Sequence, residues 1–121
     1  MITKKEELKS IPNPTQEYYE IEINCPELTF VGVKEQPDFG TLRIVYVPDK
    51  TVIELKSLKY YIVSLRDSLV SYERLINTIY EDLMEVYEPT HLYIEMNLNP
   101  RGNITSTLRL DSYWRKENDK I

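Results

Sequence analysis

The hydrophobic pattern changes from that of strands to that of helices within the stretch TVIELKSLKYYIVSLRDSL, residues 51–69. Its apolar residues step by three and four and therefore share one face of a helix: Leu55, Leu58, Ile62, Leu65 and Leu69. Thr51 and Glu54 have the spacing of a capping box at the start of that helix. The stepping resumes in a second set that ends before Pro89: Tyr72, Leu75, Ile76, Ile79, Leu83 and Val86. The sequence therefore predicts two consecutive amphipathic helices.

Segments on both sides of the helical region show the two-residue alternation of strands. Before it, apolar and polar residues alternate over residues 18–24, and residues 41–47 are rich in β-branched side chains. After it, two alternating segments flank a turn at residues 99–103 and predict a hairpin. The element order ββααββ predicts an α+β fold, with an antiparallel four-stranded sheet and two helices on one of its faces.

The chain has 121 residues, which fits one domain. Residues 1–17 show no sustained period and contain Pro12 and Pro14, so we predict a flexible N-terminal arm. Residues 18–110 form the predicted domain, and residues 111–121 form a charged tail. A single sheet of this kind leaves two open edges, and we therefore expect copies of the chain to associate.

Composition narrows the classes of function. The net charge of −5 disfavours a general nucleic-acid-binding surface. Cys25 and His91 are the only residues of their types, which excludes a Cys/His zinc cluster, and we expect no metal site. The sequence has neither an apolar stretch long enough to span a bilayer nor a signal-peptide pattern. We therefore expect a cytoplasmic protein without a membrane partner.

Three cations form a basic stripe on one flank of the first predicted helix: Lys56, Lys59 and Arg66. Near a helix N-terminus, such a stripe can hold phosphate groups through charge-assisted hydrogen bonds and the helix dipole. The same spacing also fits an ordinary solvated helix face, in which lysines pair with nearby acids. The spacing alone does not decide between these two interpretations.

The segment ELKSLKYY, residues 54–61, resembles the signature of the NADPH-dependent 7-cyano-7-deazaguanine reductases. These are nitrile reductases of queuosine biosynthesis, a tRNA modification, and they have the tunnelling fold. Further landmarks of the family follow in the same order between about residues 23 and 104: PELT at 26–29, QPDFGT at 36–41, YVP at 46–48, SLR at 64–66 and NPRG at 99–102. The predicted ββααββ order also matches the tunnelling fold, whose subunits close barrels together and place active sites between chains.

The resemblance implies sites for NADPH and for a deazapurine. The implied cofactor contacts are Lys56, Ser57, Leu58, Lys59 and Arg66, and the implied substrate contacts are Glu73, Glu54 and Tyr72. Asp38 takes the position of the general acid, which holds or relays a proton for the nitrile nitrogen. The Glu73 carboxylate can accept two parallel N–H bonds from the edge of the ring. Tyr72 stands where the family usually has a histidine.

The nucleophile is where the chain departs from the family pattern. Family members attack the nitrile with a cysteine that lies between the Pro-Glu-aromatic-Thr and Gln-Pro-Asp landmarks, and hydride then reduces the covalent thioimide. Here residues 30–35 read FVGVKE, which is one residue shorter than usual and contains no cysteine, serine or histidine. Cys25, which precedes Pro26, is the remaining candidate nucleophile.

Two functions from different classes therefore stay open. The first is an NADPH-dependent nitrile reductase-like protein that acts on 7-cyano-7-deazaguanine and self-associates to form active sites between subunits. The second is a tunnelling-fold protein that binds a purine- or pterin-like ring without reducing a nitrile. The GTP cyclohydrolase branch of the fold fits less well, because its zinc-type Cys/His constellation is missing.

Overall fold

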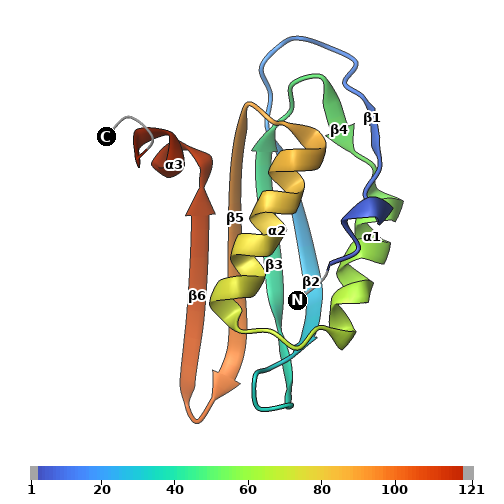
Figure 1. Ribbon diagram of the computed structural model, residues 1–121. Helices are drawn as coiled ribbons and strands as arrows, with labels where there is room; N and C mark the ends of the chain where they lie inside the picture. The colour runs from blue at the N-terminus through green and yellow to red at the C-terminus, as the bar shows by residue number, and fades with distance from the viewer. Residues whose placement is uncertain (1–2, 119–121) are drawn as a thin grey trace.

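The main sheet has four antiparallel strands in the spatial order β2-β3-β5-β6 (Figure 1). The computed structural model describes residues 3–118; residues 1 and 2 of the predicted arm and residues 119–121 of the predicted tail lie outside the described residues. The strands of this sheet are β2 (Ile21–Val31), β3 (Pro37–Val47), β5 (His91–Arg101) and β6 (Ile104–Asp111). Both helices of the predicted pair fall between β3 and β5 along the chain, so the α+β class and the ββααββ order are confirmed.

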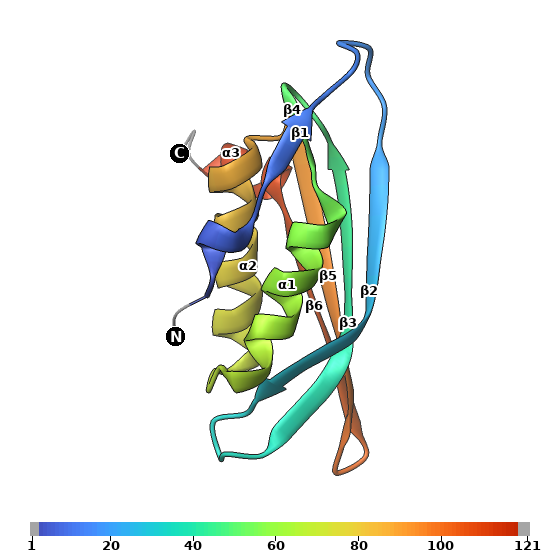
Figure 2. The same ribbon diagram turned by 90° about the vertical axis from the view of Figure 1, so that its right-hand side faces the viewer.

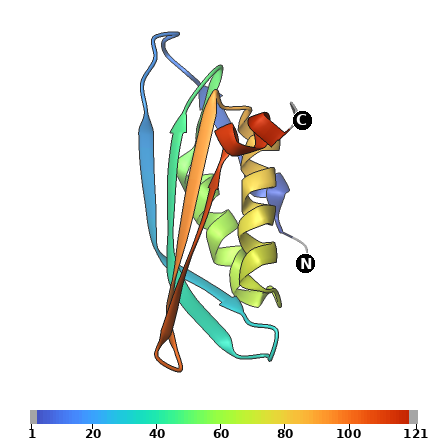
Figure 3. The same ribbon diagram turned by 90° about the vertical axis from the view of Figure 1, so that its left-hand side faces the viewer.

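Two helices cover one face of this sheet, while the opposite face is left uncovered (Figures 2 and 3). They are α1 (Leu55–Ser64), which continues into the 3-10 turn η2 (Leu65–Asp67), and α2 (Tyr72–Tyr87). Ser71 caps α2 by accepting a hydrogen bond from the Arg74 amide at 3.2 Å. The helix ends at Glu88, which has the left-handed conformation, directly before Pro89. The predicted end of the second helix is therefore confirmed.

The start of α1 differs from the predicted capping box. Thr51 belongs to the short strand β4 (Thr51–Ile53), and Glu54 is itself the N-cap residue. The Glu54 carboxylate accepts a hydrogen bond from the Ser57 amide at 2.8 Å. The box was wrong because the chain is extended at Thr51, so its hydroxyl is not placed at the helix start.

The end of α1 also falls earlier than the leucine stripe predicted. Leu69 lies outside the helix and is 52% exposed. The chain leaves the helical conformation because it pairs with the end of β2. The Val31 amide donates to the Ser68 carbonyl at 2.8 Å, and the Val70 amide donates to the Val31 carbonyl at 2.9 Å. This pairing brings the start of α2 next to the β2–β3 hairpin.

The N-terminal segment differs from the predicted flexible arm. It contains the 3-10 turn η1 (Lys5–Glu7) and the strand β1 (Ser10–Pro12), which pairs with β4. Leu8 is buried in the core, and the Tyr87 hydroxyl donates to the Lys9 carbonyl at 2.8 Å. A single buried leucine in a polar segment produces no periodic pattern, so the sequence did not reveal this anchor.

The predicted charged tail contains helix α3 (Ser112–Asn118), which the sequence did not indicate. The Ser112 hydroxyl is buried and accepts a hydrogen bond from the Leu92 amide at 3.1 Å. The Tyr113 ring stacks on the His91 ring with 4.1 Å between centroids. The boundaries of the single domain at residues 18 and 110 stay a prediction.

The core lies between the helices and the covered face of the sheet. Its helical part contains both predicted apolar stripes, except for Leu55 and Leu69, which are exposed, and for Tyr72 and Val86, which are partly buried. The largest fully buried side chains are Tyr46, Tyr61, Phe30, Leu28, Leu42, Ile44, Leu65, Leu75, Ile79, Leu83, Leu92 and Ile94. Among the described residues, no helix is long and apolar enough to cross a membrane.

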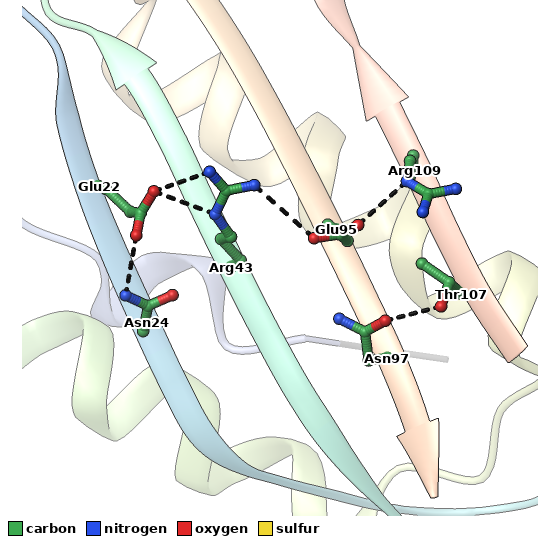
Figure 4. Close-up of polar contacts among 7 residues, drawn as sticks. All are labelled: Glu22, Asn24, Arg43, Glu95, Asn97, Thr107 and Arg109. Atoms are coloured by element: carbon green, nitrogen blue, oxygen red, sulfur yellow. Dashed lines mark hydrogen bonds and ion pairs between the residues drawn. The ribbon is translucent and has the colours of Figure 1, made fainter. Parts of the chain in front are cut away.

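The uncovered face carries a row of charges that crosses all four strands, which we call the charge ladder: Glu22, Arg43, Glu95 and Arg109 (Figure 4). The Arg43 guanidinium lies 2.8 Å from the Glu22 carboxylate and 3.7 Å from that of Glu95. Arg109 lies 3.0 Å from Glu95 on its other side. Each charge thus faces an opposite charge on the neighbouring strand.

Candidate functional site

A cavity of about 330 Å³ opens where the β2–β3 hairpin, the first turn of α2 and the end of β5 meet. We call it the Asp38 pocket; it is lined by Gly32, Val33, Lys34, Gln36, Asp38, Val70, Ser71, Tyr72, Glu73 and Arg101. In Figure 1 these three elements come together at the same end of the sheet. The pocket gathers three of the predicted site residues, namely Asp38, Tyr72 and Glu73.

Local structure fixes the positions of these three side chains. Asp38 is the second residue of β3 and lies on the covered face, opposite Phe30 of β2. Tyr72 and Glu73 occupy the first turn of α2, directly after its cap. The Phe30 ring packs edge-on against the Tyr72 ring at 5.7 Å, which connects the sheet to the helix start below the pocket.

Arg101 and Tyr72 hold the Asp38 side chain, which is only 7% exposed. Its Oδ1 atom accepts hydrogen bonds from Arg101 Nε at 2.8 Å and from the Tyr72 hydroxyl at 3.2 Å. Burial, followed by the neighbouring Asp38 carboxylate, raises the pKa of Tyr72 above its ordinary value. The Tyr72 hydroxyl therefore stays protonated and donates a hydrogen bond to the Asp38 carboxylate.

Arg101 also ties the pocket to the loop between β2 and β3. It donates to the Gln36 side chain at 2.5 Å and to the Pro37 carbonyl at 2.9 Å. Arg101 is a site residue that the sequence did not reveal, although it lies in the NPRG turn of the resemblance. Its partner Asp38 is 63 positions away, and no local pattern predicts such a contact.

Glu73 lies at the open side of the pocket and is exposed. Within residues 3–118, none of the ion pairs involves its carboxylate, which can therefore accept hydrogen bonds from a ligand. The pocket thus combines a buried acid at its floor with an exposed acid at its rim. This arrangement suits a small ring that has N–H groups on one edge.

The predicted cofactor residues lie outside the Asp38 pocket. Lys56 lines a second hollow together with Glu54 and Ser57, whereas Lys59 and Arg66 line a third hollow between β2 and α1. The three cations are exposed and can reach an anionic ligand. One chain therefore keeps the predicted cofactor residues apart from Asp38, Tyr72 and Glu73, whereas Glu54, a predicted substrate contact, lies in the hollow of Lys56 and not in the Asp38 pocket.

Ser57 and Leu58 are buried, at 4% and 3% exposure. The Ser57 hydroxyl donates to the Glu54 carbonyl at 2.7 Å and accepts from the Lys9 amide at 2.9 Å. Leu58 belongs to the hydrophobic core. Within this chain, the contacts of these two residues stabilise the helix start rather than leave their side chains open to a ligand.

Cys25 does not lie in the Asp38 pocket. It lies on β2 opposite Leu42, beside Lys59 and Arg66 in the third hollow. Leu42 is four residues along β3 from Asp38, which at 3.3 Å per residue corresponds to roughly 13 Å. Burial raises the pKa of Cys25 to about 11, so the thiol stays protonated near neutral pH and is a weak nucleophile.

An antiparallel sheet with paired helices on one face, and a pocket with a buried carboxylate beside an arginine, define an α+β protein with a candidate small-molecule site. The family model described as QueF-like protein matches residues 37–117 of the chain. The NADPH-dependent 7-cyano-7-deazaguanine reductase of Wolinella succinogenes is 41% identical over 88% of this chain and 87% of its own length. The chain therefore belongs to the QueF-like family, and the resemblance seen in the sequence is confirmed.

Other relatives agree with this assignment. The proteins of the same name from Chlorobaculum parvum and Aquifex aeolicus are 48% and 39% identical, over 74% and 90% of this chain and over 78% and 86% of their own lengths. The crystal structure of the archaeosine synthase QueF-Like in the apo form matches 80% of this chain and 94% of that chain, with a TM-score of 0.68 and 12% identity. This last likeness shows the tunnelling fold.

Proposed function

We propose that the chain is an NADPH-dependent reductase that acts on 7-cyano-7-deazaguanine in queuosine biosynthesis, and so contributes to tRNA modification. Relatives that carry this activity in their names are 39% to 48% identical over most of the chain. The observation that carries the proposal is the meeting of Asp38, Tyr72 and Glu73 in one pocket, although they come from different elements. The cytoplasmic location stays a prediction.

The pocket residues have distinct roles in this proposal. Glu73 accepts N–H bonds from the edge of the deazapurine and orients the ring. Asp38 supplies a proton to the nitrile nitrogen, and Arg101 stabilises the carboxylate that remains. Tyr72 keeps the Asp38 side chain directed at the pocket through its hydrogen bond to Oδ1.

NADPH supplies the hydride in this reaction. The exposed cations Lys56, Lys59 and Arg66 fit its phosphate groups, because each can form charge-assisted hydrogen bonds with an anion. Glu54 and Ser57 hold the helix start on which Lys56 lies. We place Leu58 in a supporting role only, since it is buried in the core.

Self-association is part of the proposal. Within one chain, the cations of α1 and the Asp38 pocket belong to different hollows. The sheet also has two open edges, at β2 and β6, which can pair with other copies. Association that brings the α1 cations of one copy to the Asp38 pocket of another, within a barrel, would complete the site between subunits.

The second candidate function is ring binding without nitrile reduction. It is favoured by residues 30–35, which contain no cysteine, serine or histidine, and by the position of Cys25 outside the Asp38 pocket. Without covalent capture of the nitrile, the reaction would lose several powers of ten in rate. A purine- or pterin-like ring would still find the acids of the Asp38 pocket.

The deciding experiment measures both the rate of NADPH oxidation and the intact mass of the protein. The full chain is mixed with NADPH and 7-cyano-7-deazaguanine, NADPH oxidation is followed by absorbance, and the intact protein mass is measured in parallel. Turnover with an adduct that Cys25→Ala abolishes would establish the reductase with a relocated nucleophile. Turnover that persists in Cys25→Ala would establish a reductase that does not use this thiol.

Binding of the nitrile base without NADPH oxidation would instead establish the second candidate function. If the base neither binds nor reacts, both functions are wrong. A Glu73→Gln variant is the control for the binding arm, because it retains the shape of the side chain but loses the carboxylate that orients the ring.

A further inference from the structure

Lys9 belongs to the N-terminal segment, yet it lines the second hollow beside Lys56 of α1. This hollow has a volume of about 310 Å³, and its other lining residues are Glu7, Glu54, Ser57 and Tyr60. The cofactor contacts that the resemblance implies all lie within residues 56–66, so they do not include Lys9. The fold therefore adds a cation from another part of the chain to the basic stripe of α1.

The backbone of Lys9 is held by residues of α2 and of the start of α1. Its carbonyl accepts hydrogen bonds from the Tyr87 hydroxyl at 2.8 Å and from the Glu54 amide at 3.1 Å. Its amide donates to the Ser57 hydroxyl at 2.9 Å. The side chain takes part in none of these bonds and is exposed. The point from which the Lys9 ammonium group extends is therefore fixed relative to the start of α1.

Both ammonium groups of the second hollow are open to an anion. In the part of the chain that the structure describes, none of the ion pairs involves Lys9 or Lys56. The Glu54 carboxylate accepts a hydrogen bond from the Ser57 amide, so it is engaged at the helix start. Glu7, the other acid of the hollow, is exposed. Two like charges in one hollow repel each other, and an anion with several oxygens relieves that repulsion.

A phosphate monoester matches this pair of cations better than a phosphate within a pyrophosphate. A monoester such as the 2′-phosphate of NADPH carries about 1.5 to 2 negative charges at pH 7 and offers three oxygens. The Tyr60 ring, which is 50% exposed, gives the same hollow an aromatic wall against which adenine can stack. The adenosine end of NADPH therefore suits the second hollow, and Lys59 and Arg66 in the third hollow are left for the pyrophosphate.

We propose that Lys9 is a further cofactor-binding residue, which together with Lys56 holds the 2′-phosphate of NADPH and so selects NADPH over NADH. The inference rests on the proposed function, since it assumes that NADPH binds along α1. It goes further, because it assigns the choice between the two cofactors to a pair of residues and gives the N-terminal segment a part in that choice.

Fluorescence titration of the full chain with NADPH and with NADH tests this proposal without any turnover. Lys9→Gln removes the charge of the side chain, and the bonds of the Lys9 backbone do not depend on that side chain. It should weaken NADPH binding about fivefold to twentyfold, as expected for a charge-assisted hydrogen bond from an exposed lysine. NADH binding should change by less than about twofold, because NADH lacks the 2′-phosphate.

Two further variants show whether the effect is local to the hollow. Lys4→Gln is the matched control, because Lys4 is exposed in the same segment but does not line the second hollow, and it should leave both affinities unchanged. Glu7→Gln removes an acid that opposes the anion and should strengthen NADPH binding about twofold to fivefold. Weaker NADPH binding by Glu7→Gln would contradict an anion in this hollow.

The outcomes separate the inference from the proposed function. If the unchanged protein binds neither NADPH nor NADH, the proposed reductase and this inference are both overturned. If it binds NADPH, and Lys9→Gln binds NADPH equally tightly while its circular dichroism is unchanged, the inference alone is overturned. Equal losses for NADPH and NADH in Lys9→Gln, or an equal loss of NADPH affinity in Lys4→Gln, would also overturn the assignment to the 2′-phosphate.

Discussion

Asp38 is the residue on which the site depends, and its environment explains its orientation. A carboxylate that is 7% exposed needs a partner, because an ionised group loses its hydration when it is buried. Arg101 provides that partner from the far end of β5, and Tyr72 provides a second donor from α2. The ion pair therefore contributes both to the geometry of the pocket and to the stability of the fold.

Arg101→Ala should lower the free energy of unfolding by about 1 to 3 kcal/mol, because it leaves the Asp38 carboxylate without its cation. The Arg101 side chain is 44% exposed, which weakens the pair and keeps the loss moderate. Urea unfolding followed by circular dichroism measures the difference. Arg109→Ala removes an exposed ion pair of the charge ladder and should cost at most about 1 kcal/mol; equal losses in both variants would contradict the structural role of Arg101.

Cys25 offers a test that depends on pH. Burial raises the pKa of its thiol from 9.0 to about 11, so the folded chain holds this proton more tightly than the unfolded chain. The contribution of Cys25 to stability is complete below pH 9 and is lost as the pH rises through 11. The unchanged protein should therefore lose more stability over this range than Cys25→Ala, as measured by urea unfolding at each pH.

The comparison with Cys25→Ala is needed because several tyrosines titrate over the same range in both proteins. Their effect cancels when the two stability curves are subtracted. Parallel curves would show that the thiol is not desolvated in the folded chain, and would reopen Cys25 as a reactive nucleophile.

The candidate site was only partly predictable from the sequence. Asp38, Tyr72 and Glu73 were found through the family resemblance, and the structure places them together. Arg101 was missed as a site residue, since its role arises from the register that brings β5 beside β3. The α1 stripe of Lys56 and Lys59 was recognisable, but periodicity on one helix does not reveal which pocket its side chains face.

At the scale of elements, long periodic segments were predictable and short anchors were not. The stripes of α1 and α2 and the alternation of the strands follow from the burial of one face, which leaves a repeating pattern in the sequence. In the described part of the N-terminal segment, Leu8 is the one buried apolar side chain that joins the core. Helix α3 is held by the hydrogen bond to the Ser112 hydroxyl and by the Tyr113 ring, which stacks on His91. Single contacts of this kind leave no period, so the sequence predicted only a flexible N-terminal arm and a charged tail at the two ends.

A pair of substitutions tests whether the N-terminal segment is anchored. Leu8→Ala should lower the free energy of unfolding by about 2 to 4 kcal/mol, because it leaves a cavity in the core beside α1 and α2. Ile11→Ala, in the same segment but 47% exposed, should cost less than about 1 kcal/mol. Thermal and urea unfolding of the two variants measure this difference in stability. A negligible effect of Leu8→Ala would support the flexible arm that the sequence predicts.

At the scale of the whole molecule, the separation of the α1 cations from the Asp38 pocket predicts that two defective chains can help each other. Asp38→Asn removes one half of the proposed site, and the double variant Lys56→Ala with Lys59→Ala removes the other. Mixed in equal amounts, they should recover a fraction of the NADPH oxidation that each lacks alone. The reason is that some interfaces between subunits then join the intact Asp38 pocket of one variant to the intact α1 cations of the other. A mixture as inactive as its components would place both halves of the site in a single chain.

The charge ladder has a consequence for how copies can join. Across the sheet its signs run negative, positive, negative, positive, from Glu22 on the β2 edge to Arg109 on the β6 edge. Joining β6 of one copy to β2 of the next continues this alternation through the seam, whereas joining two β2 edges or two β6 edges sets like charges side by side. The uncovered face therefore favours head-to-tail addition with a single polarity, which closes into a ring when the rotation per copy divides the circle.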